Sequence, residues 1–248
     1  MVERADGTGT KINDMKPNEK QKSGIGAPGG FTLVELLVVI SIIGILAGFT
    51  IPALNSFKRS AVLNQTRAEM AQLITALDSF KAAYGFYPPG NQRTDYSLPS
   101  DRFMLSPLYY ELSGTTLSGA NYVTLDGTSQ IKVADVSTAY GIGGFINCTR
   151  GSGEDSAVAR NFIPGLKQNR INENITNNIV RTTMLVAAVG GPDVTYPAKS
   201  PNVNPWRYAC PGTSNPDSYD LWMQLSIGGK TYLLCNWSKQ VQINSPLP

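Results

Sequence analysis

Residues 31–51 read FTLVELLVVISIIGILAGFTI and form one uninterrupted apolar segment. Glu35 is the only ionisable side chain in this segment. A helix of this length measures about 30 Å at roughly 1.5 Å per residue, which matches the hydrocarbon core of a bilayer. The alternative, a helix buried in a soluble core, rarely stays apolar on every face for this long. We therefore expect residues 31–51 to form a membrane-spanning helix.

The composition of the 248 residues excludes several classes of function. Hydrophobic types make up 42% and charged types 16%, which is enough apolar material for a folded core. The net charge of +3 is too small to predict nucleic-acid binding. The absence of histidine excludes every histidine base and histidine metal ligand. Three cysteines without a CxxC pattern do not predict a disulfide scaffold or a structural zinc site.

Residues 1–30 are polar, show no hydrophobic period and are predicted to be a disordered leader. A conventional signal peptide would have a shorter apolar region with its small-residue cleavage site after that region. Here Gly29 and Gly30 come before the apolar segment, so cleavage there would remove the leader and keep the anchor. Basic residues lie on both sides of the segment, so the positive-inside rule does not decide its orientation.

Glu35 requires an explanation because a carboxylate in hydrocarbon costs about 2.5–3.5 kcal/mol on insertion scales. One interpretation places it near the membrane interface, since it lies only four residues after Phe31. The other gives it a cationic partner. A new amino terminus at Phe31 would supply that cation, either in a neighbouring subunit or in the same chain.

The stretch GG-FTLVELLVVISIIGILA resembles the class III signal of type IV pilins and type II secretion pseudopilins. In that family a prepilin peptidase cleaves after the glycine, methylates the new amino terminus, and leaves Glu as the fifth mature residue. The resemblance implies cleavage between Gly30 and Phe31, N-methylation of Phe31, and a role for Glu35 in assembly and register. Pro52 matches a proline at which the helices of that family kink.

Beyond Pro52 the apolar residues recur at helical spacing until Gly85 and Pro88 end the pattern. Residues 122–125 and 131–136 suit strands, and residues 179–189 suit either a helix or a buried strand. Residues 204–212, NPWRYACPG, and 219–222, YDLW, predict an antiparallel hairpin packed on the helix. The expected fold class is α+β, with a long N-terminal helix, membrane-spanning in its first half, packed on a C-terminal antiparallel β-sheet head.

The C-terminal hairpin is similar to the end of the major pseudopilin, and the two resemblances together imply a division of the chain. Its expected parts are a cleaved leader (1–30), a transmembrane or filament-core helix (31–51), an amphipathic continuation with a loop (52–89), an inserted variable head region (90–203) and pseudopilin-type C-terminal strands (204–248).

The major pseudopilin binds calcium in its last loop, which makes Asp217 and Asp220 weak calcium candidates here. Calcium takes about 6–8 oxygen ligands, so two aspartates are too few and solvated turn residues are the favoured interpretation. No other cofactor is expected. Cys210 and Cys235 could form a disulfide in an exported domain, or could remain free thiols, and Cys148 would have no partner.

The expected function is a non-enzymatic structural subunit of a type II secretion pseudopilus that supports protein export. The resemblance implies processing by prepilin peptidase, a single pass through the bacterial inner membrane with a cytoplasmic leader and a periplasmic head, and assembly with other pseudopilins on an inner-membrane platform. The alternative is a minor type IV pilin for adhesion, motility or DNA uptake. A membrane-anchored enzyme would have only scattered carboxylates for acid–base work. A passive surface protein remains the third possibility if Phe31 is not exposed by cleavage.

Overall fold

The structure is a computed structural model, and it describes residues 29–95, 101–151, 158–176, 180–187 and 204–245. For residues 50–56, 101 and 174–176 it describes the backbone alone. The chain divides into two compact units, residues 1–49 and 50–248. The five parts predicted from the sequence remain predictions, because this division rests on contacts between residues and does not test where the chain is cleaved.

Helix α1 runs from Leu33 to Tyr84 and confirms the predicted long N-terminal helix. The apolar stripe of its second half is buried at the predicted three- and four-residue spacing, with Leu73, Leu77 and Phe80 as members. The helix ends where Gly85 donates its backbone N–H to the carbonyl of Lys81 at 2.7 Å. The backbone stays helical through position 52, and the kink at Pro52 remains a prediction.

The C-terminal residues form an antiparallel sheet in the order β11-β10-β9-β8. The predicted hairpin is confirmed, because Arg207 pairs with Trp222 and Ala209 pairs with Asp220 on either side of the Pro211-Gly212 loop. The strands are β8 (Arg207–Ala209), β9 (Asp220–Ile227), β10 (Lys230–Cys235) and β11 (Ser238–Ile243).

The middle region adds two further sheets. One has the order β3-β2-β1-β4, in which only the β1–β4 pair is parallel, and the other has the order β5-β6-β7. Their strands are β1 (Thr115–Ser118), β2 (Asn121–Thr124), β3 (Gln130–Lys132), β4 (Cys148–Thr149), β5 (Ile171–Thr176), β6 (Val180–Ala187) and β7 (Asn204–Pro205). The helical elements are α2 (Asp101–Met104), α3 (Leu108–Ser113), α4 (Val133–Tyr140) and the 3-10 turn η1 (Gln168–Arg170).

Two sequence expectations for the middle region change. The predicted strand over residues 131–136 is right only at its start, because α4 begins at Val133. Val136, Ala139 and Tyr140 are buried at helical spacing, so tertiary packing overrides the local alternation. The ambiguous segment at residues 179–189 contains strand β6, which pairs with β5 on one side and β7 on the other.

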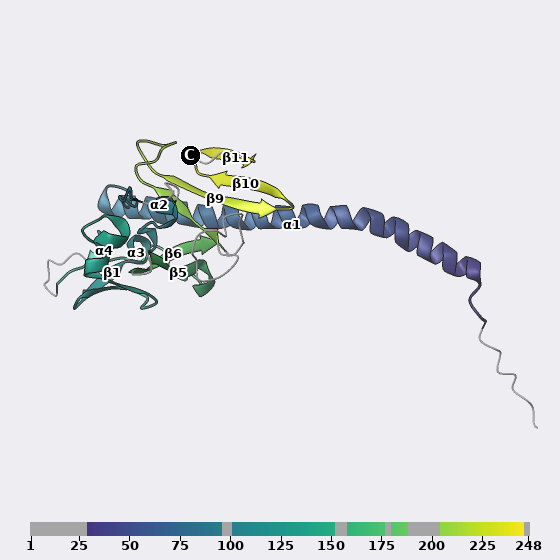
Figure 1. The fold of residues 1–248 in the computed structure, drawn as a ribbon, viewed down its shortest axis with the longest axis horizontal. Coiled ribbons are helices and arrows are strands. Elements are labelled where there is room, and N and C mark those ends of the chain that lie inside the picture. The colour runs from purple at the N-terminus through teal and green to yellow at the C-terminus, as the bar shows by residue number, and fades with distance from the viewer. Residues whose placement is uncertain (1–28, 96–100, 152–157, 177–179, 188–203, 246–248) are drawn as a thin grey trace, which may run out of the picture. The chain divides into compact units, whose positions relative to one another are not determined.

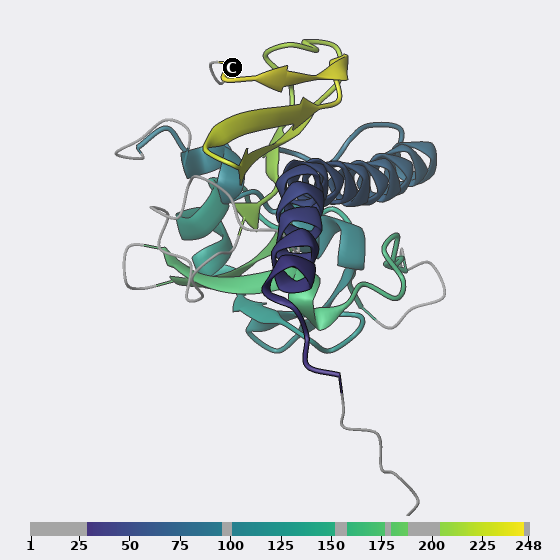
Figure 2. The ribbon, with the colours of Figure 1, turned by 90° about the vertical axis from the view of Figure 1, so that its right-hand side faces the viewer.

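The described residues from 57 onward share one main core. Figures 1 and 2 show the second half of α1 between the C-terminal sheet, in yellow, and the strands of the middle region, in teal and green. Side chains of all three layers belong to the same buried cluster, including Leu77 from α1, Leu221 from β9, and Tyr110 from α3. The described part of the middle region is therefore integrated with α1 and the C-terminal sheet in this unit and shares their core.

A buried polar network fixes the end of α1 to the middle region. The Tyr84 hydroxyl donates to Asn147 Oδ1 at 2.7 Å, and the same oxygen accepts the Arg160 backbone N–H at 2.8 Å. The backbone N–H groups of Ile146 and Asn147 each donate to a separate oxygen of the Glu111 carboxylate at 2.9 Å. Glu111 is fully buried, so this network determines how the helix end is held.

Candidate assembly site at the helix N-terminus

The start of α1 is closed by hydrogen bonds between Thr32 and Glu35. The Thr32 backbone N–H and its hydroxyl donate to Glu35 Oε2 at 2.8 Å and 2.7 Å. The Glu35 backbone N–H donates to Thr32 Oγ1 at 3.2 Å. With Leu33 as the first helical residue, this arrangement is a capping box, in which the cap residue and the third helical residue satisfy each other's backbone donors.

The capping box gives Glu35 an intrachain partner that the sequence reasoning missed. The signal was present, because Thr32-Leu33-Val34-Glu35 fits the pattern in which Ser or Thr is followed three residues later by Glu before an apolar run. In this chain, with the Gly30–Phe31 peptide bond intact, Glu35 is bound by its own helix terminus. Pairing with an amino terminus would add a charged partner to these neutral donors.

Gly30 and Phe31 lie just before the capping box. Phe31 is 78% exposed, and a Cβ placed on Gly30 would meet no atom within 4 Å. Packing therefore does not require glycine at position 30. The cleavage and methylation roles of these residues remain predictions.

The described apolar side chains of residues 31–49 are exposed, and Leu33 and Ile45 are 79% and 63% accessible. Monomeric soluble proteins rarely expose contiguous apolar surface of this extent. The surface therefore indicates contact with lipid or with other protein.

Among the side chains described, α1 does not meet the combined length and apolarity criteria for a membrane span, and neither does any other helix.

The remaining predicted site residues lie in the C-terminal sheet. Asp217 is exposed and Asp220 is fully buried. The described residues contain no group of three or more His, Cys, Asp and Glu side chains that could hold a metal ion. Asp217 and Asp220 therefore belong to no such group among the described residues.

The sequence left open whether Cys210 and Cys235 form a disulfide, and in the structure both are free thiols, as is Cys148. Cys210 follows β8 and Cys235 ends β10, and β9 lies between these strands. Two strand spacings amount to about 10 Å, which exceeds the roughly 7 Å that a disulfide tolerates between Cα atoms. Burial raises the pKa of both the Cys210 and the Cys235 thiols.

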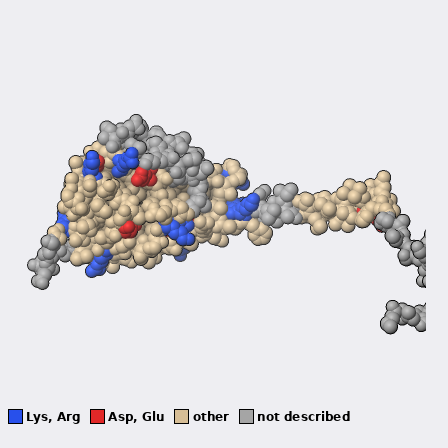
Figure 3. Space-filling view, turned by 90° about the horizontal axis from the view of Figure 1, so that it is seen from below, with Lys and Arg blue, Asp and Glu red and all other residues tan. Residues whose placement is uncertain are grey.

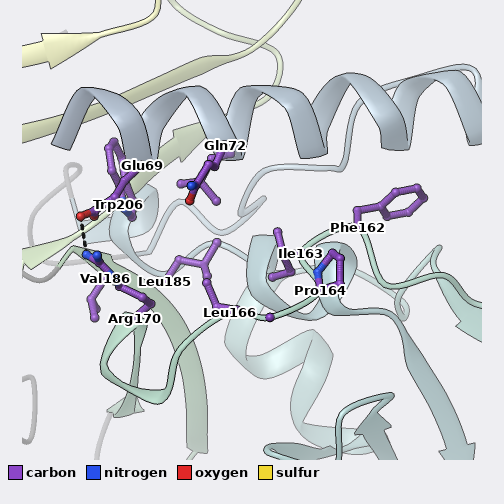
Figure 4. Close-up of a pocket in the computed structure, with 12 residues that line it drawn as sticks. Glu69, Gln72, Phe162, Ile163, Pro164, Leu166, Arg170, Leu185, Val186 and Trp206 are labelled. Atoms are coloured by element: carbon purple, nitrogen blue, oxygen red, sulfur yellow. Dashed lines mark ion pairs between the residues drawn. The ribbon is translucent and has the colours of Figure 1, made fainter. Parts of the chain in front are cut away.

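A pocket of about 270 Å³ lies between α1 and the middle region. Glu69 Oε1 and Arg170 Nη1 form an ion pair at 2.5 Å at one end, beside Trp206, and Phe162 lies toward the other end (Figure 4). The carboxylate is held by the guanidinium, and most of the remaining lining is apolar. This pocket joins α1 to the middle region and presents no acid–base pair.

One face of the head carries only scattered charges. On the face shown in Figure 3, basic and acidic side chains are scattered among uncharged residues, without a large area of one sign. Such a surface provides no strong electrostatic steering.

The comparisons with known proteins concern the first part of the chain. Residues 28–51 match the family described as the prokaryotic N-terminal methylation motif. The chain is similar to type II secretion system core protein G of Escherichia coli (37% identity over 78 residues, covering 32% of this chain and 49% of that protein). It is also similar to the protein of the same description from Vibrio cholerae (40% over 63 residues, 25% and 43%). A fimbrial protein of Eikenella corrodens is 41% identical over 56 residues, covering 23% of this chain and 35% of that protein.

The chain thus spans about half the length, or less, of these curated relatives. No solved structure matches. The matched proteins are of the pilin and pseudopilin type, which are structural proteins and not enzymes. The N-terminal part of this chain therefore carries the N-methylation motif of the type IV pilin kind and is homologous to the type II secretion core protein G, the major pseudopilin.

Proposed function

We propose that this chain is a structural subunit of a type II secretion pseudopilus. In this proposal a prepilin peptidase cleaves between Gly30 and Phe31 and methylates the new amino terminus. Residues 31–51 anchor the subunit in the inner membrane, with the leader cytoplasmic and the head periplasmic. Other pseudopilins and an inner-membrane platform then assemble it into a filament. The proposed span includes positions 50 and 51, whose side chains lie outside the described set.

The observation that carries this proposal is the combination of an exposed apolar helix with a single carboxylate one turn from the cleavage position. Hydrolysis of the Gly30–Phe31 bond would create an ammonium group one residue before Thr32, which already contacts Glu35. A carboxylate moved into an apolar helix bundle requires a cation as well as neutral hydrogen-bond donors. The new terminus of a neighbouring subunit supplies that cation and fixes the register between helices.

The apolar side chains of α1 provide the assembly surface. Transfer of a helix from lipid to a bundle of equally apolar helices changes little hydrophobic free energy, so packing and polar contacts decide the association. The head is outside this surface because its main apolar cluster is already buried against the second half of α1. Energy for extraction would come from a separate ATPase.

A role in secretion is favoured over a surface pilus by the matches to core protein G and by the C-terminal β8–β9 hairpin that the sequence resemblance singled out. The match to a fimbrial protein keeps a minor type IV pilin as the second candidate. Loss of protein export after deletion of the gene supports the first role. Loss of adhesion, motility or DNA uptake with intact export supports the second.

The decisive test is the intact mass and amino-terminal sequence of the protein purified from its native membrane. The expected product begins at N-methylated Phe31. A Gly30→Leu variant should keep residues 1–30, because it changes the residue before the proposed cleavage site, whereas the matched control Gly29→Ala should still be cleaved. Neither substitution should disturb the fold, because a Cβ at either glycine meets no atom within 4 Å. A wild-type chain that keeps residues 1–30 in cells with an active peptidase would contradict the proposal.

A further inference from the structure

The loop between β8 and β9 is built around the carboxylate of Asp220. This side chain is fully buried at the start of β9. Asp220 Oδ2 accepts the Ser214 backbone N–H at 2.6 Å. Asp220 Oδ1 accepts the Asn215 backbone N–H at 3.1 Å and the Asn215 side-chain amide at 2.9 Å. Three N–H groups of one short loop therefore converge on one anion.

These donors occupy the positions that a bound cation would need. An ionised carboxylate offers about four lone-pair sites, and three of them accept hydrogen bonds here. Each N–H group directs the positive end of its dipole toward the carboxylate and would repel a cation placed there. Asp217, the other acidic residue of the loop, is exposed and forms no described group with Asp220. The donor chemistry of the loop therefore does not fit calcium, which needs about 6–8 oxygen ligands.

The loop backbone at Gly212 also packs directly against the Asp220 carboxylate. A Cβ placed on Gly212 would lie 2.7 Å from Asp220 Oδ1 and 2.9 Å from the Asn215 carbonyl oxygen. The loop closes on itself, because Gly212 N–H donates to the Ser218 carbonyl at 3.1 Å and Ser218 N–H donates to the Asn215 carbonyl at 3.0 Å. Glycine at position 212 is therefore a packing requirement of this arrangement.

Contacts around Tyr219 join the loop to the rest of the head. The Tyr219 carbonyl accepts the side-chain amides of Asn215 at 3.2 Å and Asn236 at 2.8 Å. The centroid of the Tyr219 ring lies 4.6 Å from the centroid of the Tyr87 ring, and Tyr87 belongs to the segment that follows α1. These contacts therefore link the β8–β9 loop to the segment that follows the end of α1.

We infer that Asp220 acts as an internal anion that organises the β8–β9 loop, and that this loop folds without a bound cation. The sequence analysis favoured solvated turn residues over a calcium site at Asp217 and Asp220. The structure shows Asp220 buried instead, with its carboxylate accepting N–H donors from the loop itself. Stability of the head is then independent of calcium. This inference does not depend on cleavage or filament assembly, because its test measures unfolding.

The test is thermal unfolding of the full chain in detergent micelles, with calcium chloride or with a calcium chelator. The wild-type midpoint should be the same in both conditions. Asp220→Asn should lower the midpoint by roughly 5 °C or more, because the new amide group directs N–H donors toward the loop donors. The matched control Asp217→Asn should leave the midpoint unchanged, since that side chain is exposed.

A second variant keeps the test interpretable if Asp220→Asn does not fold. Asn215→Ala preserves the carboxylate and both backbone donors, and it should lower the midpoint by a smaller amount. A calcium-dependent rise of the wild-type midpoint that Asp220→Asn or Asn215→Ala abolishes would overturn the inference. So would an Asp220→Asn protein as stable as wild type in the presence of chelator.

Discussion

The unfolding free energy of this protein should fall between pH 4.5 and pH 7 through the titration of one buried carboxyl group. Burial raises the pKa of Glu111 from 4.5 to about 7, although the N–H groups of Ile146 and Asn147 favour its charged form. A pKa raised in the folded state means that the native protein holds a proton which the unfolded chain has released. The stabilising contribution is complete below pH 4.5 and is lost as the pH rises through about 7.

The size of this effect follows from the pKa change. Each pH unit between the unfolded and folded pKa values corresponds to about 1.4 kcal/mol, so the contribution of Glu111 reaches about 3 kcal/mol. Full burial means that solvent screening does not reduce this figure much. For a chain of this size, 3 kcal/mol corresponds to a change in melting temperature of roughly 6–12 °C.

The measurement is chemical unfolding of wild type and of Glu111→Gln at several pH values between 4.5 and 8, in detergent. Gln does not titrate, so the difference between the two curves isolates Glu111 from other carboxylates such as Asp95, whose pKa is lowered by its hydrogen bond to Arg93. The wild-type advantage should shrink as the pH rises. Asp217→Asn, at an exposed position, serves as a control. A wild-type advantage that is constant or grows across this range would refute the reasoning.

Three further predictions concern α1. Thr32→Val removes the hydroxyl of the capping box and should cost about 1 kcal/mol of local helix stability. The backbone amide of Glu35 should then exchange its hydrogen faster, and an unchanged exchange rate would contradict the role of the cap. Glu35→Gln should leave cleavage intact and reduce co-purification of tagged with untagged copies, because the amine loses its counter-charge, and undiminished co-purification would rule out the charge pair. Phe80→Ala should lower the unfolding free energy by about 3–5 kcal/mol because Phe80 is fully buried. Phe86→Ala, at a half-exposed position, is its control. Equal losses of stability for the two variants in calorimetry would contradict this view of the core.

Local sequence patterns predicted the elements whose information is local. The stripe that includes Leu73 and Phe80 repeats at helical spacing, and Gly85 ends it, so α1 was predictable over most of its length. The pairing of β8 with β9 was predictable because two apolar runs flank the Pro211-Gly212 pair, although the structure joins them by the longer loop of residues 210–219. Strand β3 and helix α4 were not separated, since short apolar runs suit both periods until their packing partners are known.

The candidate site residues also differ in how far the sequence could predict them. Gly30, Phe31, Glu35 and the missed cap at Thr32 all lie within six residues, so their chemistry can be read from the chain alone. The pairing of Cys210 with Cys235 could not be judged from sequence, because the strand that separates them is a property of the sheet order.

The sequence by itself determined the long helix, the single carboxylate of its apolar first part and the N-terminal methylation motif, because these depend on residues that are neighbours along the chain. The tertiary structure decided that the Asp220 carboxylate faces three N–H donors and that Glu111 is buried, with its carboxylate accepting the N–H groups of Ile146 and Asn147. Those environments are made by backbone groups brought together by loop closure and by packing across distant segments. A residue's type shows that it can carry a charge, and its folded surroundings decide whether that charge binds a metal, holds a loop or takes up a proton.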